Sequence, residues 1–230
     1  MNELGAKVSL IIPTLNEVGS IEAVLNEVPR DVVDEVLIVD GHSTDGTPEL
    51  VARLGFAVIQ QMGRGYGDAL ATGFKHVAGD IIVLADADGS YELGDIRHLV
   101  QRVREGADLA LGSRYLPESG SDDDTFVRYV GNKAFTFLFR AMYQVEISDA
   151  LFFYAAIRRE VVQAITATSP GFEYIVEFLI KARRAGFKFA EIPSAEKART
   201  SGRSKVNAFR DGLRMLWCMT RAKLRRDGGF

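Results

Sequence analysis

Asp86 and Asp88 are the pair of residues in this chain best suited to chemistry, because they directly follow an apolar run over residues 81–85. Such a run is typical of a buried strand. Two carboxylates just past its end provide the oxygen ligands that Mg²⁺ and Mn²⁺ prefer. Ligands of an open α/β sheet bind outside the carboxyl ends of its strands. The pair therefore predicts a site where a divalent cation meets a phosphorylated substrate.

An acidic loop without a metal is the competing interpretation, and two further strand ends weigh against it. The apolar run 35–39 is followed by Asp40, and the run 8–12 is followed by the stretch 13–17, which ends in an amide and an acid. Parallel strands present their carboxyl ends at one edge of a sheet. We therefore expect the three strand ends to line a single pocket.

Length, charge and cysteine content exclude several classes of protein. The chain has 230 residues, which suits one large α/β domain, and its net charge of −3 excludes a nucleic-acid binder by bulk charge. The single cysteine, Cys218, excludes an internal disulfide and a Cys-rich zinc site, and it fits a reducing compartment. The sequence shows no signal peptide and no apolar run long enough to span a bilayer. We expect a cytoplasmic protein, peripheral on the cytosolic face of a membrane.

Strands and helices alternate along the first half of the chain, which predicts βαβ units and a mostly parallel sheet. The strands are expected over residues 8–12, 36–39, 57–60, 81–85 and 109–112. The helices between them are expected over residues 17–28, 47–54, 68–77 and 93–104. Further helices are expected over 127–143, 172–185 and 206–226, with a strand over 187–192. The acidic segment 119–125 is interpreted as a solvated loop in preference to a second metal site.

The segment 199–205 combines three cations, two serines, a threonine and a glycine, a composition that suits phosphate binding. A solvated basic linker is the alternative. Arg114 follows the strand 109–112, and Arg128 precedes the Phe-rich helix. Either arginine is expected to hold phosphate or to pair with an acid such as Asp122.

The last helix is amphipathic and basic, and two interpretations of it stay open. It is expected either to lie on an anionic membrane surface or to pack its apolar side on the domain. The apolar side consists of Phe209, Leu213, Leu216, Trp217 and Leu224. The basic side consists of Arg210, Arg214, Arg221 and Arg225.

Taken together, these motifs resemble the family 2 glycosyltransferases of the GT-A fold, in particular the group that glycosylates dolichyl and other polyprenyl phosphates. The resemblance runs from residue 12 to residue 205. It is carried by Ile12-Pro13-Thr14-Leu15-Asn16-Glu17, residues 39–47, Gly65-Tyr66-Gly67-Asp68-Ala69, Asp86-Ala87-Asp88-Gly89, Gly112-Ser113-Arg114-Tyr115 and Arg199-x-x-Gly202-x-Ser204-Lys205.

The resemblance implies a three-layer, Rossmann-like α/β fold whose mostly parallel central sheet is flanked by helices. Residues 1–205 would form the catalytic domain, divided into a nucleotide-binding half (1–115) and an acceptor half (116–205). Residues 206–230 would form the basic amphipathic helix. The implied activity is inverting transfer of a hexose from GDP-mannose or a UDP-hexose to a polyprenyl phosphate, with Mg²⁺ or Mn²⁺ as cofactor.

The resemblance also implies roles for individual residues. Asp86 and Asp88 would hold the metal, and Arg128, Ser204 and Lys205 the acceptor phosphate. The nucleotide sugar would contact Pro13, Leu15, Glu17, Val39, Asp40, Gly65, Asp86, Ala87, Asp88, Arg114, Arg199 and Lys205. The catalytic set would be Asp88, Arg114, Arg199, Lys205 and, for a hydroxyl acceptor, Asp149 as the general base.

The chain departs from this group over Ser148-Asp149-Ala150-Leu151-Phe152-Phe153-Tyr154, and Ser90 stands two residues after the second metal aspartate. A hydroxyl acceptor therefore stays an alternative. A nucleotidyltransferase and a non-catalytic nucleotide-sugar-binding subunit are weaker alternatives. Because the chain lacks the transmembrane helices common in the family, a membrane-anchoring partner subunit is also expected.

Overall fold

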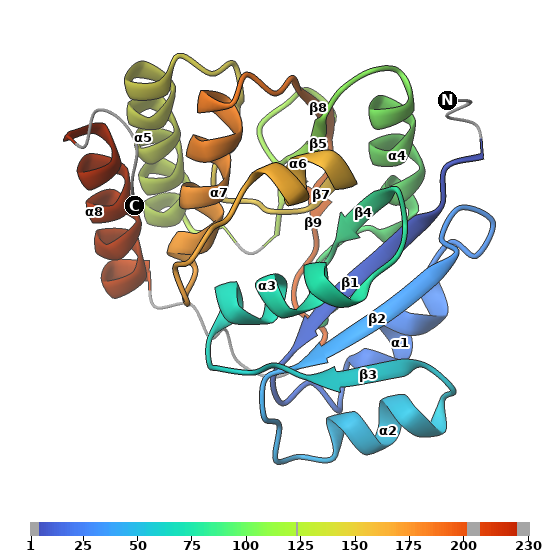
Figure 1. Ribbon diagram of the computed structural model, residues 1–230. Helices are drawn as coiled ribbons and strands as arrows, with labels where there is room; N and C mark the ends of the chain where they lie inside the picture. Colours follow the sequence, from blue (N-terminus) through green and yellow to red (C-terminus); the bar gives the residue numbers. More distant parts are fainter. Residues whose placement is uncertain (1–4, 123, 202–207, 225–230) are drawn as a thin grey trace.

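The computed structural model describes residues 5–122, 124–201 and 208–224. A seven-stranded sheet crosses the centre of the molecule in the order β3-β2-β1-β4-β7-β5-β8 (Figure 1). Its strands are β1 (Val8–Thr14), β2 (Glu35–Asp40), β3 (Ala57–Gln60), β4 (Ile81–Leu84), β5 (Leu109–Ser113), β7 (Ala155–Arg158) and β8 (Phe189–Pro193). All neighbouring strands are parallel except β7, which is antiparallel to both β4 and β5.

Helices cover both faces of this sheet, so the expected three-layer α/β fold is confirmed. One face packs against α1 (Ile21–Glu27), α2 (Thr47–Arg53) and α4 (Ile96–Arg104), the last preceded by the 3₁₀ turn η2 (Leu93–Asp95). The other face packs against α3 (Tyr66–His76), α5 (Phe126–Tyr143), α6 (Arg159–Ala164), α7 (Glu173–Arg184) and α8 (Ala208–Leu224). The alternating side chains of each strand enter two separate cores, because successive residues of a strand point to opposite faces.

The parallel register brings the expected strand ends to one edge. Thr14 at the end of β1 pairs with Asp40 at the end of β2, and Ile11 pairs with Leu84 at the end of β4. The residues after β4 therefore lie beside the last residues of β1, 12–14. A short second sheet of β6 (Gly120–Ser121) and β9 (Ala195–Glu196), with a bridge from Tyr91 to Glu196, runs close to the same edge.

The strands and helices expected in the first half agree with the structure to within a few residues, apart from a later start of α1. Among the described elements, the sequence pattern missed β6, α6, β9 and, in the central sheet, strand β7. Its first three residues are fully buried, and they follow directly on the aromatic stretch 152–154. A short apolar run without flanking turn residues gives no periodicity that separates a strand from a buried helix.

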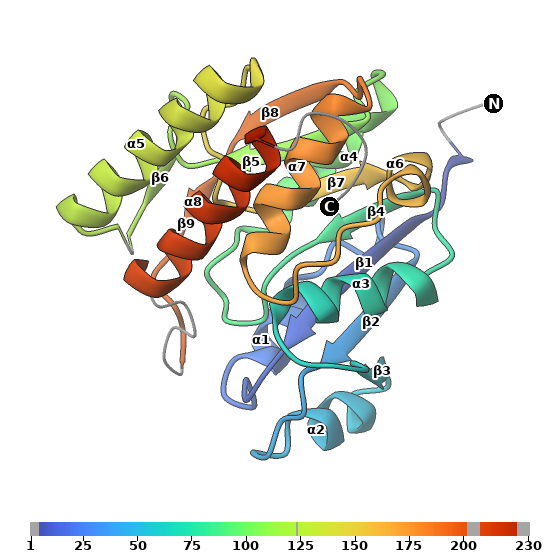
Figure 2. The same cartoon turned by 60° about the vertical axis from the view of Figure 1, so that its left-hand side comes forward.

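Helices α5, α7 and α8 stand side by side at one end of the molecule (Figures 1 and 2). Helix α8 is fixed along its second half, where the Tyr143 hydroxyl donates to the Met219 carbonyl at 2.6 Å. Lys223 Nζ also donates to the Met142 carbonyl at 2.6 Å. Residues 206, 207, 225 and 226 of the predicted helix lie outside the described residues.

The apolar side expected for α8 does not pack on the domain. Its members are exposed, with Phe209 at 78% and Trp217 at 65% of their surface. The side that packs on α5 and α7 consists instead of Met215, Cys218, Met219 and Ala222. Within the described residues, no helix combines the length and the apolar character that a membrane crossing requires.

Candidate functional site

The two aspartates expected to bind metal lie at the bottom of a cleft, where two cavities meet. One cavity has a volume of about 320 Å³ and the other of about 500 Å³. Five residues line both cavities: Tyr66, Asp86, Asp88, Phe172 and Arg199. Because these residues face both spaces, a molecule in one cavity and a molecule in the other would meet at the aspartates.

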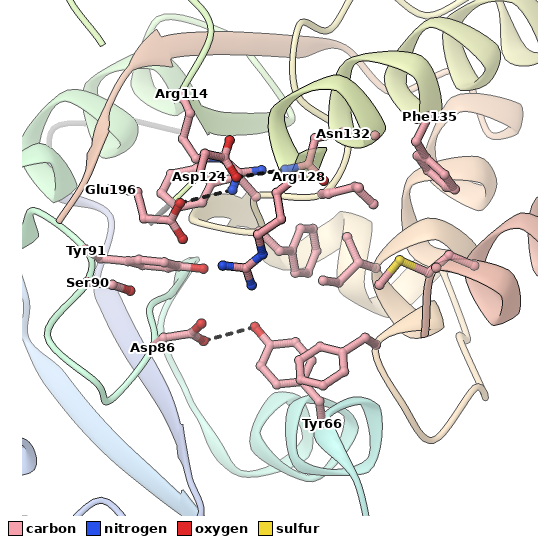
Figure 3. A pocket seen from close by; sticks show the side chains of 18 of the residues that line it. Tyr66, Asp86, Ser90, Tyr91, Arg114, Asp124, Arg128, Asn132, Phe135 and Glu196 are labelled. Atoms are coloured by element: carbon pink, nitrogen blue, oxygen red, sulfur yellow. Dashed lines mark hydrogen bonds and ion pairs between the residues drawn. The ribbon is translucent and has the colours of Figure 1, made fainter. Parts of the chain in front are cut away.

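Asp86 is held by aromatic neighbours. The Tyr66 hydroxyl, from the first residue of α3, donates to Asp86 Oδ1 at 3.2 Å (Figure 3), and the Tyr66 ring stacks on Phe172 at 4.9 Å. Burial and, next, the negative charge of Asp88 raise the pKa of Asp86 to about 7, against hydrogen bonds from Tyr91 and Tyr66. A nearby cation would therefore strongly favour the ionised form of this carboxyl.

Asp88 is held by the segment that follows β9. Arg199 Nη2 lies 2.8 Å from Asp88 Oδ2, and Thr200 donates to the Asp88 carbonyl from its backbone nitrogen (3.0 Å) and its hydroxyl (2.7 Å). Gly89 makes this contact possible. Its φ is +79°, and a Cβ there would lie 2.4 Å from Thr200 Oγ1.

These two carboxylates fit a hard divalent cation. Both carboxylates line one cleft. Burial, and next the charge of Asp88, raise the pKa of Asp86, and a bound cation would offset both effects. Among the described residues, no group of three His, Cys, Asp or Glu side chains is arranged to hold a metal. A two-carboxylate site suits Mg²⁺ or Mn²⁺ whose remaining ligands are waters and substrate phosphates.

The smaller cavity, called here the donor cavity, collects most residues expected to contact a nucleotide sugar. Pro13, Leu15 and Glu17 line it from the end of β1, and Gly65 lines it from the start of α3. Asp86, Ala87, Asp88 and Arg199 are the other members of the predicted set that line it. Reasoning from the sequence missed the other lining residues: Thr14, Gly41, Gln61, Tyr66, Ala69, Gly171, Phe172, Arg210, Asp211 and Arg214. Tyr66 belongs to the motif 65–69 that the resemblance uses. The residues just before α7 and those on α8 belong to no such motif, so nothing in the sequence near them indicates the site.

Val39 and Asp40 do not line the donor cavity, contrary to the expectation that they contact the nucleotide sugar. Both are buried beneath it. The Asp40 carboxylate accepts hydrogen bonds from the Thr14 hydroxyl at 3.2 Å and from the Ser43 backbone nitrogen at 2.9 Å. Asp40 thus fixes the end of β1 and the turn after β2, which shape the cavity wall. Lys205, expected in the same set, lies outside the described residues.

Arg114 lines the larger cavity and not the donor cavity, and its guanidinium is held by two acids. Its Nε and Nη2 donate to the two oxygens of Asp149 at 2.7 and 3.1 Å, and its Nη1 donates to Glu196 at 3.1 Å. Burial opposes the charge of Arg114, but these carboxylates outweigh burial and raise its pKa. The alternative that Arg114 pairs with an acid is therefore correct, although its partners are Asp149 and Glu196, not Asp122.

Asp149 is poorly placed for the general base that a hydroxyl acceptor requires. It is 1% exposed, and besides Arg114 it accepts a hydrogen bond from the Leu151 backbone nitrogen. It also does not line either cavity. A base must reach the proton that it removes. The geometry makes Asp149 a partner that stabilises buried Arg114.

The larger cavity, called here the acceptor cavity, has a polar end near the aspartates and an apolar end between the helices. The apolar end is lined by Val127, Phe135, Leu151, Phe153, Ile175, Phe209 and Met215. At the polar end, the Arg128 side chain reaches into the cavity towards Asp86 and Tyr91 (Figure 3). Arg128, which the resemblance assigns to the acceptor phosphate, therefore lines this cavity, whereas Ser204 lies outside the described residues.

The acidic loop 119–125 is not merely solvated. Asp124 lines the acceptor cavity and accepts hydrogen bonds from the Tyr115 hydroxyl at 2.8 Å and from Asn132 Nδ2 at 3.2 Å. Its carboxylate thereby fixes Asn132, which faces the same cavity one turn after Arg128 on α5. Asp124 lies in a loop as expected, but it forms part of the cavity wall and is not simply solvated.

Comparison with protein families gives one match, to glycosyl transferase family 2 over residues 9–166. The chain is 33% identical over 203 residues to an uncharacterized glycosyltransferase of Mycobacterium tuberculosis, covering 88% of this chain and 91% of that protein. The chain therefore belongs to glycosyl transferase family 2. This confirms the resemblance seen in the motifs.

Two further relatives are longer proteins with named activities. The chain is 33% identical to the low-salt glycan biosynthesis hexosyltransferase Agl6 of Haloferax volcanii, covering 93% of this chain and 53% of that protein. It is 31% identical to a dolichol-phosphate mannosyltransferase of Pyrococcus furiosus, covering 87% of this chain and 59% of that protein. The chain thus spans little more than half the length of these two relatives.

Solved structures support the same fold. A crystal structure of glucosyl-3-phosphoglycerate synthase from Mycobacterium tuberculosis, in complex with Mn²⁺, UDP and phosphoglyceric acid, superimposes with a TM-score of 0.77. It covers 99% of this chain and 82% of that chain at 20% sequence identity. The GT-A arrangement of the sheet and helices is therefore confirmed.

Proposed function

We propose that this protein transfers a hexose, with inversion, from a nucleotide sugar to a polyprenyl phosphate of the dolichyl type. The observation that carries the proposal is the meeting of two unlike cavities at Asp86, Asp88 and Arg199. One cavity opens at the strand ends, as nucleotide sites of α/β folds do. The other joins a polar end to an apolar chamber, as an amphiphilic phosphate would require.

On the donor side, Pro13, Leu15 and Glu17 would receive the base and ribose of GDP-mannose or a UDP-hexose. Asp86 and Asp88 would hold Mg²⁺ or Mn²⁺, which when bound neutralises charge on the leaving nucleoside diphosphate. Arg199, 2.8 Å from Asp88, would add positive charge close to the same phosphates. Lys205 is proposed for the same role from the sequence motif alone.

On the acceptor side, Arg128 would bind the phosphate and direct it towards the anomeric carbon. A phosphate monoester is already an anion at neutral pH, with a second pKa of about 6. It therefore needs no general base, which agrees with the buried Arg114–Asp149 pair. The apolar end of the cavity would take the first units of the prenyl chain. The name of the Pyrococcus relative, a dolichol-phosphate mannosyltransferase, supports this acceptor.

The protein would work as a peripheral protein at the cytosolic membrane face, where a prenyl chain is available. Exposed apolar side chains of α5 and α8, among them Phe126, Phe137, Phe209 and Trp217, support this placement. Large exposed apolar patches mark sites of interaction with proteins or membranes. A membrane-anchoring partner subunit is proposed on the same basis.

The test is a transfer assay with Mn²⁺ or Mg²⁺, a polyprenyl phosphate, and GDP-mannose, UDP-glucose or UDP-N-acetylglucosamine in turn. We expect an acid-labile glycolipid with one donor and its disappearance in Asp88→Ala. Asp149→Asn, with activity expressed per folded molecule, should retain most of the rate. A loss of about 100-fold or more in that variant would support a hydroxyl acceptor instead, given what general bases contribute. Product formation from a free sugar or alcohol, but not from the lipid phosphate, would overturn the proposal.

A further inference from the structure

The first turns of α8 separate the two cavities and present a different set of side chains to each. Phe209, Gly212 and Met215 face the acceptor cavity, whereas Arg210, Asp211 and Arg214 line the donor cavity. Positions three and four apart share one face of a helix. The division between apolar and charged walls therefore follows from the helical period of α8.

The charged wall is held in place by a buried carboxylate. Asp211 is 3% exposed, and its Oδ1 lies 3.1 Å from Arg210 Nε and 3.9 Å from Arg214 Nη1. More than half of each arginine side chain is exposed. The carboxylate thus orients two guanidinium groups whose outer parts are accessible to a ligand. The packed second half of α8 keeps this turn over the cavity.

The charge balance of the donor cavity indicates what these arginines bind. Glu17, Asp86, Asp88 and Asp211 give the wall four carboxylates, and its third cation, Arg199, is engaged by Asp88. A nucleoside diphosphate adds further negative charge to this cavity. Among the described residues, the cations on this wall besides Arg199 are Arg210 and Arg214 of α8. Guanidinium groups match phosphate oxygens in geometry as well as charge.

We propose that Arg210 and Arg214 bind the phosphate oxygens of the nucleotide-sugar donor, with Asp211 as the residue that positions them. Helix α8 is then a wall of the donor site and not only a surface element. The inference rests on the proposed function, since it takes the smaller cavity as the nucleotide site. Arg210 and Arg214 thus bind the donor, whereas one interpretation of the amphipathic pattern placed them against an anionic membrane surface.

The test compares nucleotide binding by the full chain and by Arg210→Gln, Arg214→Gln and the double variant. Arg221→Gln is the matched control. Arg221 is exposed on the same side of α8, about 16 Å along the helix from Arg210 and about 10 Å from Arg214, and it lines neither cavity. Calorimetric titrations with UDP and GDP in Mn²⁺ would be run at low and high salt, with uridine and guanosine as ligands that lack phosphate.

We expect each donor-cavity variant to bind the diphosphate about five- to tenfold more weakly, as for a partly exposed charge-assisted hydrogen bond. The double variant should also show a smaller salt dependence, because fewer ion pairs are screened. Affinity for the nucleosides should not change, and Arg221→Gln should behave as the unmodified protein. Unchanged thermal unfolding would show that the variants remain folded.

Three outcomes would overturn the inference. Equal losses in all variants, Arg221→Gln included, would indicate a diffuse charge effect. Unchanged diphosphate affinity with reduced sedimentation on phosphatidylglycerol vesicles would assign the two arginines to a lipid surface. Failure of the unmodified protein to bind either diphosphate with Mn²⁺ or Mg²⁺ would overturn the proposed function, and the inference with it.

Discussion

The donor side and the acceptor side of the cleft are built in different ways. The donor side consists mainly of short segments that directly follow strands β1 and β4 or precede helix α3. The apolar end of the acceptor side is assembled from α5, α7, α8 and the apolar stretch 151–153, which come together only through packing. Backbone hydrogen bonds fix the first region, whereas side-chain contacts between helices fix the second.

This difference suggests that the donor side determines the reaction and the acceptor side determines the choice of acceptor. The sheet register fixes the ends of β1 and β4, and Glu17 and Asp86 follow these ends within three residues. We therefore expect both residues to keep one geometry whatever the acceptor. The acceptor wall depends on helices whose spacing follows the size of their side chains. Substitutions on the donor side should therefore affect the reaction with every acceptor, and substitutions on the acceptor side should affect the choice of acceptor.

The largest effect is expected at the junction of the two regions. Asp88→Asn should lower the transfer rate by about 100- to 1,000-fold, because it removes charge stabilisation from the transition state. The measurement is the initial rate with saturating donor, beside Mn²⁺ binding. Asp31→Asn, an exposed aspartate paired with Arg97, is the control and should leave the rate unchanged. A rate near that of the control would remove Asp88 from the proposed mechanism.

A smaller but substantial effect is expected on stability when Asp149 is changed. Asp149→Asn should lower the free energy of unfolding by about 3 kcal/mol, because it leaves the buried Arg114 guanidinium with one carboxylate partner. Urea denaturation checks the value. If stability were unchanged while transfer stopped, Asp149 would act on the substrate and the comparison of the two regions would need revision.

The apolar end of the acceptor cavity offers a test of selectivity. Phe135→Ala should reduce kcat/KM for a long polyprenyl phosphate by about tenfold or more, as expected for the loss of a large apolar contact. The KM of the donor should stay constant. Leu224→Ala, an exposed residue on the adjacent helix outside both cavities, is the control. Equal changes in donor and acceptor parameters would argue against separate cavities.

The loop that joins the two regions gives the smallest expected effect. Glu177 on α7 accepts hydrogen bonds from Thr168, Ser169 and Lys181, and the Pro170 carbonyl in the same loop accepts from Gly67 on α3. Burial raises the pKa of Glu177, but these hydrogen bonds outweigh burial and lower it overall. Its carboxylate therefore stabilises the fold above the pKa in the unfolded chain, about 4.3, and this stabilisation is lost as the pH falls further.

Glu177→Gln should accordingly lower the free energy of unfolding by about 1–2 kcal/mol at pH 7, with a smaller difference below pH 4. Urea denaturation at both pH values measures this. A difference that grows on acidification would mean that the carboxylate is destabilising, contrary to its hydrogen bonds.

Much of the donor side could be predicted from the sequence. The errors of that prediction share one cause, which is that a sequence pattern does not show which side chains become buried. The strand ends, the paired aspartates and Arg199 fall together as expected. Val39 and Asp40 belong to the same motifs but lie beneath the cavity, because position within a motif does not reveal burial. The helical period of α8 was recognised, but the side that packs was not, since both sides carry apolar residues.

The sequence by itself determined the three-layer α/β fold, the family and the carboxylate pair, because each depends on local periodicity and on residues adjacent in the chain. Only the tertiary structure decided that β7 enters the sheet antiparallel and that Arg114 pairs with Asp149 and Glu196. It alone brought Arg210 and Arg214 to the donor cavity. These features depend on contacts between residues far apart in the chain, which packing selects and local pattern does not encode.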